Sequence, residues 1–196
     1  SPIHAAAISA KYSKGVGTPD CKDTSDMEWI TRVMQASGRW DETREFRTYV
    51  CVKSPLCLRG RDADIVHYQV KRGWLTHIVG VPIMGATSPC TLAGDIAQRL
   101  AETFGFLSFS RLITPPPNNR LKAGAFSSAP VEMDLRNGNL ITASPQGRLC
   151  RIALTEIQGE FYKMPGGGGG IDLVTDAAEP GLQACVEKAL SGMATL

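Results

Sequence analysis

The chain has 196 residues, 43% of them hydrophobic, so it can bury a core and one domain is the expected number. Its 21 basic and 19 acidic residues nearly balance and the basic ones are scattered, which excludes a strongly basic surface for nucleic acid or anionic lipid. No apolar run reaches the roughly 18 residues of a membrane helix, and residues 1–15 lack the basic start and apolar core of a signal peptide. We therefore expect a cytoplasmic protein.

Five elements are predicted before the middle of the chain. Residues 2–12 are alanine-rich and suit a short helix, and residues 14–18 suit a strand end that runs into a loop. A helix is predicted over 26–38, because it opens with acidic residues, carries one apolar stripe and ends at a glycine. Residues 46–52 favour a strand and residues 62–72 a helix. The stripe of the helix over 26–38 comprises Met27, Ile30, Val33 and Met34.

The stretch over residues 76–107 organises the chain. Its first part, residues 78–84, is too continuously apolar for a half-exposed strand and suits a parallel strand buried on both faces. A turn of small and polar residues follows, and after Pro89 an amphipathic helix is predicted. We expect this turn, at the carboxyl end of a strand, to be where a ligand binds. The helix carries an apolar stripe of Leu92, Ile96 and Leu100, with a close-packing shoulder of Ala93, Ala97 and Ala101.

The second half of the chain begins with a proline-rich connector at residues 114–119, which is incompatible with a helix. A strand is predicted over 121–126, and a loop over 134–138. Ser144 and Pro145 suit the N-cap and first position of a helix that runs to about residue 164. The expected apolar stripe of that helix comprises Leu149, Ile152, Ala153 and Ile157.

A run of five glycines at residues 166–170 precedes the last helix. It lacks the Gly-Lys-Ser/Thr ending of a phosphate-binding loop and follows a helix, so we interpret it as a linker. The last helix is predicted over 181–196, where the sequence stops without a cap. Its apolar residues are Leu182, Val186, Ala189, Leu190 and Met193.

Strand-then-helix units in succession account for most of the chain, with connections long enough for parallel crossovers. This order is typical of an α/β fold, and it leaves two architectures open. One is half of a (β/α)8 barrel and the other is an open doubly wound sheet. Because half a barrel has two open sheet edges, the pattern suggests a piece of a longer protein.

The six cysteines are dispersed over a chain that does not need disulfides, so we expect free, buried thiols. The chain has no Cys-x-x-Cys pair, and its three histidines lie far apart, which gives no zinc signature. One arrangement stays open, because Cys51, Cys57 and Cys90 fall near expected strand ends and a metal site would form if they converged.

Four motifs, in one order and spacing, resemble the trimethylamine methyltransferase family, the corrinoid-dependent group with both pyrrolysine and non-pyrrolysine members. The resemblance covers nearly the whole chain and is closest to the non-pyrrolysine members. The motifs are Gly85-Ala86-Thr87-Ser88-Pro89 with Thr91-Leu92-Ala93-Gly94, Val52-Lys53-Ser54-Pro55-Leu56, Asp134-Leu135-Arg136-Asn137-Gly138, and Thr175-Asp176 with Gln183-Ala184 and Glu187-Lys188.

The resemblance implies a (β/α)8 TIM barrel of which residues 1–196 form the central portion. It also implies a reaction that moves a methyl group from a methylated amine, such as glycine betaine, to the Co(I) of a separate corrinoid protein. The corrinoid is then supplied by that partner, because the chain has no Asp-x-His-x-x-Gly cobalamin signature. The remaining expectations are a small methylated amine as substrate, a homo-oligomer, no membrane or nucleic-acid partner and no metal site.

The resemblance also assigns roles to residues at the expected strand ends. The hydroxyls would contact the substrate, two carboxylates would oppose its ammonium, and small residues would leave room for the corrinoid. For the hydroxyls the alternative is ordinary turn capping, and for Asp134 it is an ion pair with Arg136 or a hydrogen bond within its loop. The substrate-binding set is Ser54, Thr87, Ser88, Ser127, Asp134 and Asp176, beside Ser128, and the corrinoid-facing set is Gly85, Ala86 and Gly124.

The chain departs from the family pattern at several places. Pyrrolysine is expected near Leu173 and Val174, which are ordinary residues here and disfavour trimethylamine as the substrate. Gln146-Gly147 stands where the family often has a glutamate, and Gly181 and Cys185 also depart. The alternative function is therefore an inactive or divergent barrel protein that binds a small methylated compound, and the catalytic residues stay unassigned.

Overall fold

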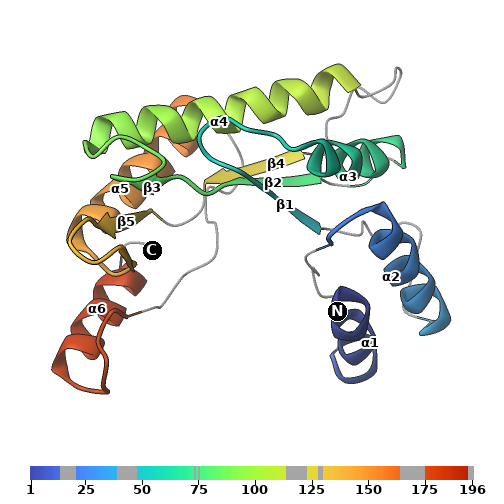
Figure 1. Cartoon of the computed structure of the whole chain (residues 1–196), viewed down its shortest axis with the longest axis horizontal. Helices are drawn as coiled ribbons and strands as arrows, with labels where there is room; N and C mark the ends of the chain where they lie inside the picture. Colours follow the sequence, from blue (N-terminus) through green and yellow to red (C-terminus); the bar gives the residue numbers. More distant parts are fainter. Residues whose placement is uncertain are drawn as a thin grey trace. The chain divides into compact units, whose positions relative to one another are not determined.

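The computed structural model describes residues 1–13, 21–38, 48–72, 74, 76–113, 123–127, 130–163 and 175–193. The chain divides into two units, which are described separately. The first comprises Ser1–Val52, Leu58–Val79 and Gly105–Ala125, and the second Lys53–Cys57, Gly80–Phe104 and Phe126–Leu196. Both contain helices and strands (Figure 1). The mixed α/β class is therefore confirmed.

The first unit contains the helices α1 (Pro2–Tyr12), α2 (Thr24–Ala36) and α3 (Gly60–Lys71) and the strand β1 (Thr48–Val52). The predicted helix over 2–12 is confirmed. Helix α2 begins two residues before the predicted start, because the Asp23 side chain accepts a hydrogen bond from the Asp26 amide at 2.9 Å. One hydrophobic core includes residues of α1, α2, α3, β1 and part of α4. Its buried members include Ala6, Ala10, Met27, Ile30, Met34, Val50, Val52, Ile65, Val66 and Phe106.

Two sheets form among the described residues, and they make no closed barrel. One has the strand order β1-β2-β4, with β2 at Thr76–Gly80 and β4 at Ala123–Ser127. Helix α3 lies between β1 and β2 in the sequence, and α4 (Leu92–Ile113) lies between β2 and β4. Each of these strands is thus separated from the next strand of the sheet by a helix. The barrel itself stays a prediction.

The second sheet has the order β3-β5-β6 and belongs to the second unit. Strand β3 (Ile83–Met84) runs parallel to β5 (Val131–Asp134), and β6 (Asn139–Ile141) returns antiparallel to β5. The unit is completed by α5 (Pro145–Glu156), the π-helical turn η1 (Ile157–Phe161) and α6 (Leu182–Met193). Residues 134–138, predicted as a loop, form the turn of the β5–β6 hairpin.

The single strand predicted over 78–84 is wrong. The chain forms β2 and β3, which belong to different sheets, and the break lies at Val81 and Pro82. Proline has no amide hydrogen to continue a ladder, and the Pro82 carbonyl is instead bound by a side chain of α4.

The predicted buried faces of three helices, α4, α5 and α6, are also wrong in part. On α4 the alanine shoulder at residues 93, 97 and 101 is exposed, and the fully buried positions are mostly polar. On α5 the side chains of Leu149 and Ile152 are 59% and 40% exposed, whereas Cys150 and Leu154 are buried. The apolar side chains of α6 that periodicity marked are exposed, and its buried residue is Ser191.

The six cysteines are free, as predicted, but only Cys21 and Cys150 are buried. Within the described ranges, no group of three or more His, Cys, Asp or Glu side chains is placed to hold a metal ion. The convergence of Cys51, Cys57 and Cys90 on a metal is therefore unsupported. None of the described helices is both long and apolar enough to cross a membrane. Residues 14–18, 114–119 and 166–170 lie outside the described residues.

Candidate functional site

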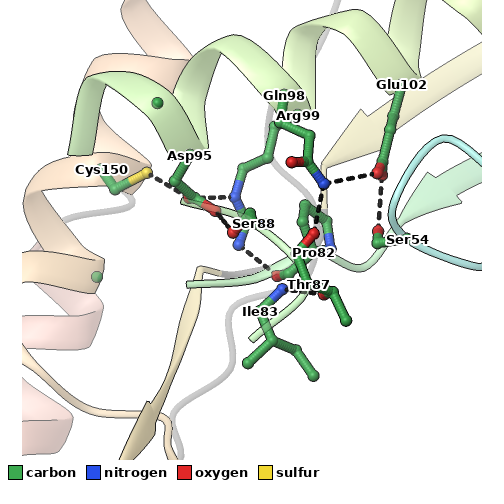
Figure 2. Close-up of polar contacts among 12 residues, drawn as sticks. Ser54, Pro82, Ile83, Thr87, Ser88, Asp95, Gln98, Arg99, Glu102 and Cys150 are labelled. Carbon is green, nitrogen blue, oxygen red and sulfur yellow. Dashed lines mark hydrogen bonds and ion pairs between the residues drawn. The ribbon is translucent and has the colours of Figure 1, made fainter. Parts of the chain in front are cut away.

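Helix α4 turns a polar face into the second unit. The side chains of Asp95 and Arg99 are fully buried, and Glu102 is 1% exposed as a residue. These residues stand four and three positions apart, so they lie on one side of the helix. In Figure 2 they point, with Gln98, toward the segments that follow β1 and β3. Buried charged groups are rare and require partners.

Asp95 and Arg99 form the innermost part of this polar face. Arg99 Nε donates to Asp95 Oδ2 at 2.5 Å, and Arg99 Nη2 donates to the Pro82 carbonyl at 2.6 Å. The second carboxylate oxygen of Asp95 accepts a hydrogen bond from Ser88 Oγ. The pair thereby fixes both ends of the segment that contains β3, at Pro82 and at Ser88.

Cys150 of α5 contacts the same aspartate, with 3.3 Å from its Sγ to Asp95 Oδ2. Burial and the charge of Asp95 raise the pKa of Cys150 to about 12. The thiol therefore stays protonated and acts as a hydrogen-bond donor, which disfavours it as a nucleophile.

Glu102 holds the loop after β1, which comprises Lys53–Cys57. Ser54 Oγ donates to Glu102 Oε2 at 2.8 Å, and the Leu56 amide donates to Glu102 Oε1 at 3.1 Å. Gln98 Nε2 lies 3.2 Å from Glu102 Oε1 and also donates to the Thr87 carbonyl at 2.6 Å. The polar face of α4 thus contacts two loops at strand ends.

The second of these loops, residues 85–88, is a tight turn after β3. Amides of residues 86–88 donate to the Ile83 carbonyl, and Thr87 Oγ1 accepts from the Ile83 amide at 2.9 Å. Gly85 has a φ of +84°, a conformation that favours glycine. The Thr87 hydroxyl thus caps its turn, whereas the hydroxyls of Ser54 and Ser88 donate to the carboxylates of Glu102 and Asp95. Contact of these hydroxyls with a substrate stays a prediction.

Asp134 begins the turn of the β5–β6 hairpin and is paired with a neighbouring side chain. Arg136 Nη2 lies 3.0 Å from Asp134 Oδ2, and Arg136 also donates through its backbone amide and Nε. The hydrogen bond from the Arg136 side chain lowers the pKa of Asp134. The ion pair considered as the alternative for Asp134 is therefore present.

Asp176 binds the start of α5. Its carboxylate accepts hydrogen bonds from the amides of Thr142 and Ala143, at 2.9 and 2.8 Å to Oδ2, and from Thr142 Oγ1 at 2.7 Å. Burial raises its pKa, but the hydrogen bonds from Thr142 and Ala143 outweigh burial, so the pKa lies below its usual value. The carboxylate remains charged near neutral pH.

Glu187 of α6 holds the Thr175-Asp176 motif in turn. It accepts hydrogen bonds from the Thr175 hydroxyl, from the Asp176 amide at 2.8 Å and from Gln183 Nε2 at 2.8 Å. The Thr175 hydrogen bond lowers the pKa of Glu187. Residues of the fourth motif are therefore in direct contact with one another. One function of Glu187 is to hold the chain at Thr175 and Asp176 against α6.

Replacing Asp176 by asparagine is expected to lower the free energy of unfolding by about 1 kcal/mol at pH 7, because asparagine accepts weaker hydrogen bonds. The pKa of Asp176 is lower in the folded state, so its contribution is present above the ordinary carboxyl value of about 4. It is lost as the pH falls through the folded pKa. Urea unfolding at pH 7 and pH 3 measures the difference, with D64N on the exposed face of α3 as control. An effect equal at both values would contradict the prediction.

Five of the nine predicted site residues lie on the two loops held by α4: Ser54, Gly85, Ala86, Thr87 and Ser88. Asp134 and Asp176 belong to separate hydrogen-bonded groups in the same unit. Gly124 and Ser127 belong to β4, but their side-chain surroundings, like the whole of Ser128, lie outside the described residues. Sequence reasoning missed Asp95, Gln98, Arg99 and Glu102. The signal was present, because polar residues recur at helical spacing through this segment.

The first unit has a groove of about 600 Å³ between α2 and α3. It is lined by Glu28, Arg32, Tyr68, Arg72 and Trp74, among others, and the Arg72 guanidinium lies 3.5 Å from the centre of the Tyr68 ring. Burial raises the pKa of Tyr68. Since none of these residues belongs to the four motifs, we place the candidate site on the loops held by α4.

Comparison with known proteins identifies the family of this chain. The model of the family described as trimethylamine methyltransferase (MTTB) matches residues 7–196. Relatives named trimethylamine methyltransferase include one from Desulfitobacterium hafniense, 24% identical over 81% of this chain and 31% of its own length. Others from Methanosarcina mazei and Methanosarcina barkeri are each 26% identical, over 87% and 85% of this chain and 35% and 33% of their own. The chain spans about a third of the length of these curated relatives. It belongs to the trimethylamine methyltransferase family.

Proposed function

We propose that the protein carrying this chain transfers a methyl group from a methylated amine to the Co(I) of a partner corrinoid protein. In this proposal the chain forms the central portion of a (β/α)8 barrel, and the substrate is a quaternary amine such as glycine betaine. The observation that carries the proposal is the family match across residues 7–196. Ordinary residues at Leu173 and Val174, where the family's pyrrolysine is expected, favour a substrate other than trimethylamine.

The corrinoid is proposed to arrive bound to the partner. The two histidines whose side chains the structure describes, His4 and His67, are exposed on α1 and α3, which does not suit a buried cobalt ligand. Ala86 is exposed on the loop after β3, and a side chain at Gly85 would meet Cys90 Sγ only at 3.6 Å. Small residues at this loop suit the approach of a bulky group. The corrinoid supplies the Co(I) that accepts the methyl group.

The methylated amine requires negative charge nearby and protection from water. Asp134 forms an ion pair with Arg136, whereas the hydrogen-bond donors of Asp176 are uncharged amide and hydroxyl groups and the charge of Arg148 has the smallest influence on its pKa. Asp176 therefore keeps more of its attraction for an ammonium. We propose it, rather than Asp134, as the carboxylate that opposes the substrate cation.

The test uses the complete protein that carries this sequence, its cognate corrinoid protein in the Co(I) state and a panel of quaternary and tertiary methylated amines. An absorbance change of the corrinoid protein that depends on both the amine and the enzyme is expected for at least one quaternary amine. No change with any amine would contradict the methyltransferase proposal. Calorimetric binding of an amine without methyl transfer would instead support the second candidate, a divergent protein that binds a methylated compound. That candidate is favoured by the departure at Gln146-Gly147.

A further inference from the structure

We propose that Glu102 is a positioning residue that locks the loops at Lys53–Cys57 and residues 85–88 into one rigid edge, which binds the methylated substrate. The substrate role of that edge rests on the proposed function. The locking itself rests on contacts within the second unit (Figure 2). Glu102 lies in the middle of α4, away from the four motifs that indicated the site, and is assigned no contact with the substrate.

The loop at Lys53–Cys57 is closed on itself and then fastened by Glu102. Lys53 and Cys57 exchange two backbone hydrogen bonds, at 3.0 and 3.1 Å, which makes the loop one small unit. Inside it, Leu56 has a φ of +49°, and its side chain is 63% exposed. Because the Leu56 side chain packs little, we expect the two hydrogen bonds from Ser54 and Leu56 to Glu102 to supply much of the stability of the loop's position.

Gln98 extends the fastening to the second loop. Its Nε2 donates to the Thr87 carbonyl at 2.6 Å and to Glu102 Oε1 at 3.2 Å. Glu102 Oε1 therefore links the Leu56 amide with a donor that is fixed by Thr87. A shift of either loop disturbs the same carboxylate, so the loops are mechanically coupled.

The sequence leaves space for this carboxylate at Gly80, the last residue of β2. A Cβ at position 80 would lie 2.8 Å from Glu102 Oε2, closer than van der Waals contact permits. Glu102 is 1% exposed, so its carboxylate cannot turn into solvent without losing these partners. The geometry thus supports one position for Glu102. Loops that follow parallel strands are where α/β enzymes usually bind their ligands, and the loop at residues 85–88 follows β3, which pairs in parallel with β5.

The test compares E102A with E102Q in the complete protein. Glutamine retains Oε1 for Leu56 and Gln98, and its amide group donates to Ser54 Oγ, so the isosteric variant keeps the lock. Amide hydrogen exchange in peptides covering 53–57 and 83–88 is expected to rise about tenfold or more in both loops of E102A. It should stay within about threefold of the wild type in E102Q. The matched control is E160A, because Glu160 is 86% exposed.

If E102A does not fold, Q98A decides the question, because it removes the bridge and leaves the hydrogen bonds from Ser54 and Leu56 to Glu102 intact. Its exchange should rise at residues 83–88 more than at 53–57. If either loop of E102A exchanges its amide hydrogens at the wild-type rate, the locking is overturned. If E102A is unfolded, a wild-type exchange rate at residues 83–88 of Q98A overturns it.

A second measurement tests the link to substrate binding. With an amine that the wild type demethylates, E102A should raise KM about tenfold or more while kcat changes less than about threefold, and E102Q should restore KM. An unchanged KM in E102A would overturn the substrate role. A wild type that transfers no methyl group contradicts the proposed function and with it this role, while the exchange data still decide whether Glu102 locks the loops.

Discussion

Replacing Arg99 by methionine is expected to lower the free energy of unfolding by about 3–5 kcal/mol, the usual cost of removing one partner from a buried ion pair. Both side chains of the pair are fully buried, and 2.5 Å separates Arg99 Nε from Asp95 Oδ2. Without Arg99, the Asp95 carboxylate would be left without its cation, and the Pro82 carbonyl would lose its donor. The segment that contains β3 would then keep only its contacts with α4 at Thr87 and Ser88.

The matched control is R136M in the β5–β6 turn. Arg136 also pairs with an aspartate, but its side chain is 89% exposed, so its loss is expected to change stability far less than the loss of Arg99. The double variant D95L/R99M should recover much of the loss, because no buried charge then remains unpaired. Urea denaturation of the complete protein measures all three. If R99M lowers the free energy of unfolding no more than R136M does, the buried ion pair does not contribute substantially to the stability of this unit.

Local signals in the sequence were sufficient for several helices. A short helix was predicted within residues 2–12, where α1 forms, and Ser144 caps α5 by accepting from the Gly147 amide at 2.9 Å. Gly38 has a φ of +67° just after α2, as expected for a glycine that ends a helix. These features depend on residues within a few positions of one another. Sequence is informative there, because helix caps and periodicity are local interactions.

The strands predicted over 46–52 and 121–126 overlap β1 and β4, but the strand predicted over 78–84 failed, because distant partners decide it. Residues 78–84 look like one apolar strand, but their division into β2 and β3 depends on which strands pair with each part. The Pro82 carbonyl is bound by Arg99, which lies 17 positions away. Strands β5 and β6 are short and only partly buried, so they gave no alternating apolar pattern.

The candidate site was predicted in part. The motif residues Ser54, Thr87 and Ser88 were assigned to expected strand ends, and α4 contacts the loops of all three. The contacting residues were missed because charged residues in a helix are ordinarily assigned to solvent. Helix α4 reverses that rule in its first half, where Asp95 and Glu102 are buried and Ala93 is exposed. In this unit the hydrogen bonds that hold the loops decide which side of α4 faces inward.

The same helix offers a test of its contacts by one substitution at two positions. G94A is expected to lower the free energy of unfolding by about 1–3 kcal/mol, the usual cost of overpacking. A Cβ at position 94 would lie 2.7 Å from Pro89 Cβ and 2.8 Å from Thr91 Oγ1. The proline ring is rigid, so the turn that leads into α4, and with it Ser88, would have to move.

G105A is expected to raise the free energy of unfolding by about 0.5–1 kcal/mol, because alanine reduces the entropy of the unfolded chain inside a helix. Nothing lies within 4 Å of a Cβ at position 105. Both substitutions carry a gain in helix propensity, so the difference between them reports the contact of residue 94 with Pro89. Thermal and urea unfolding of the two variants should therefore show shifts of opposite sign. If the two variants change the free energy of unfolding by the same sign and size, the turn before α4 moves without an energetic penalty. Pro89 would then not be needed to position Ser88 for its hydrogen bond with Asp95.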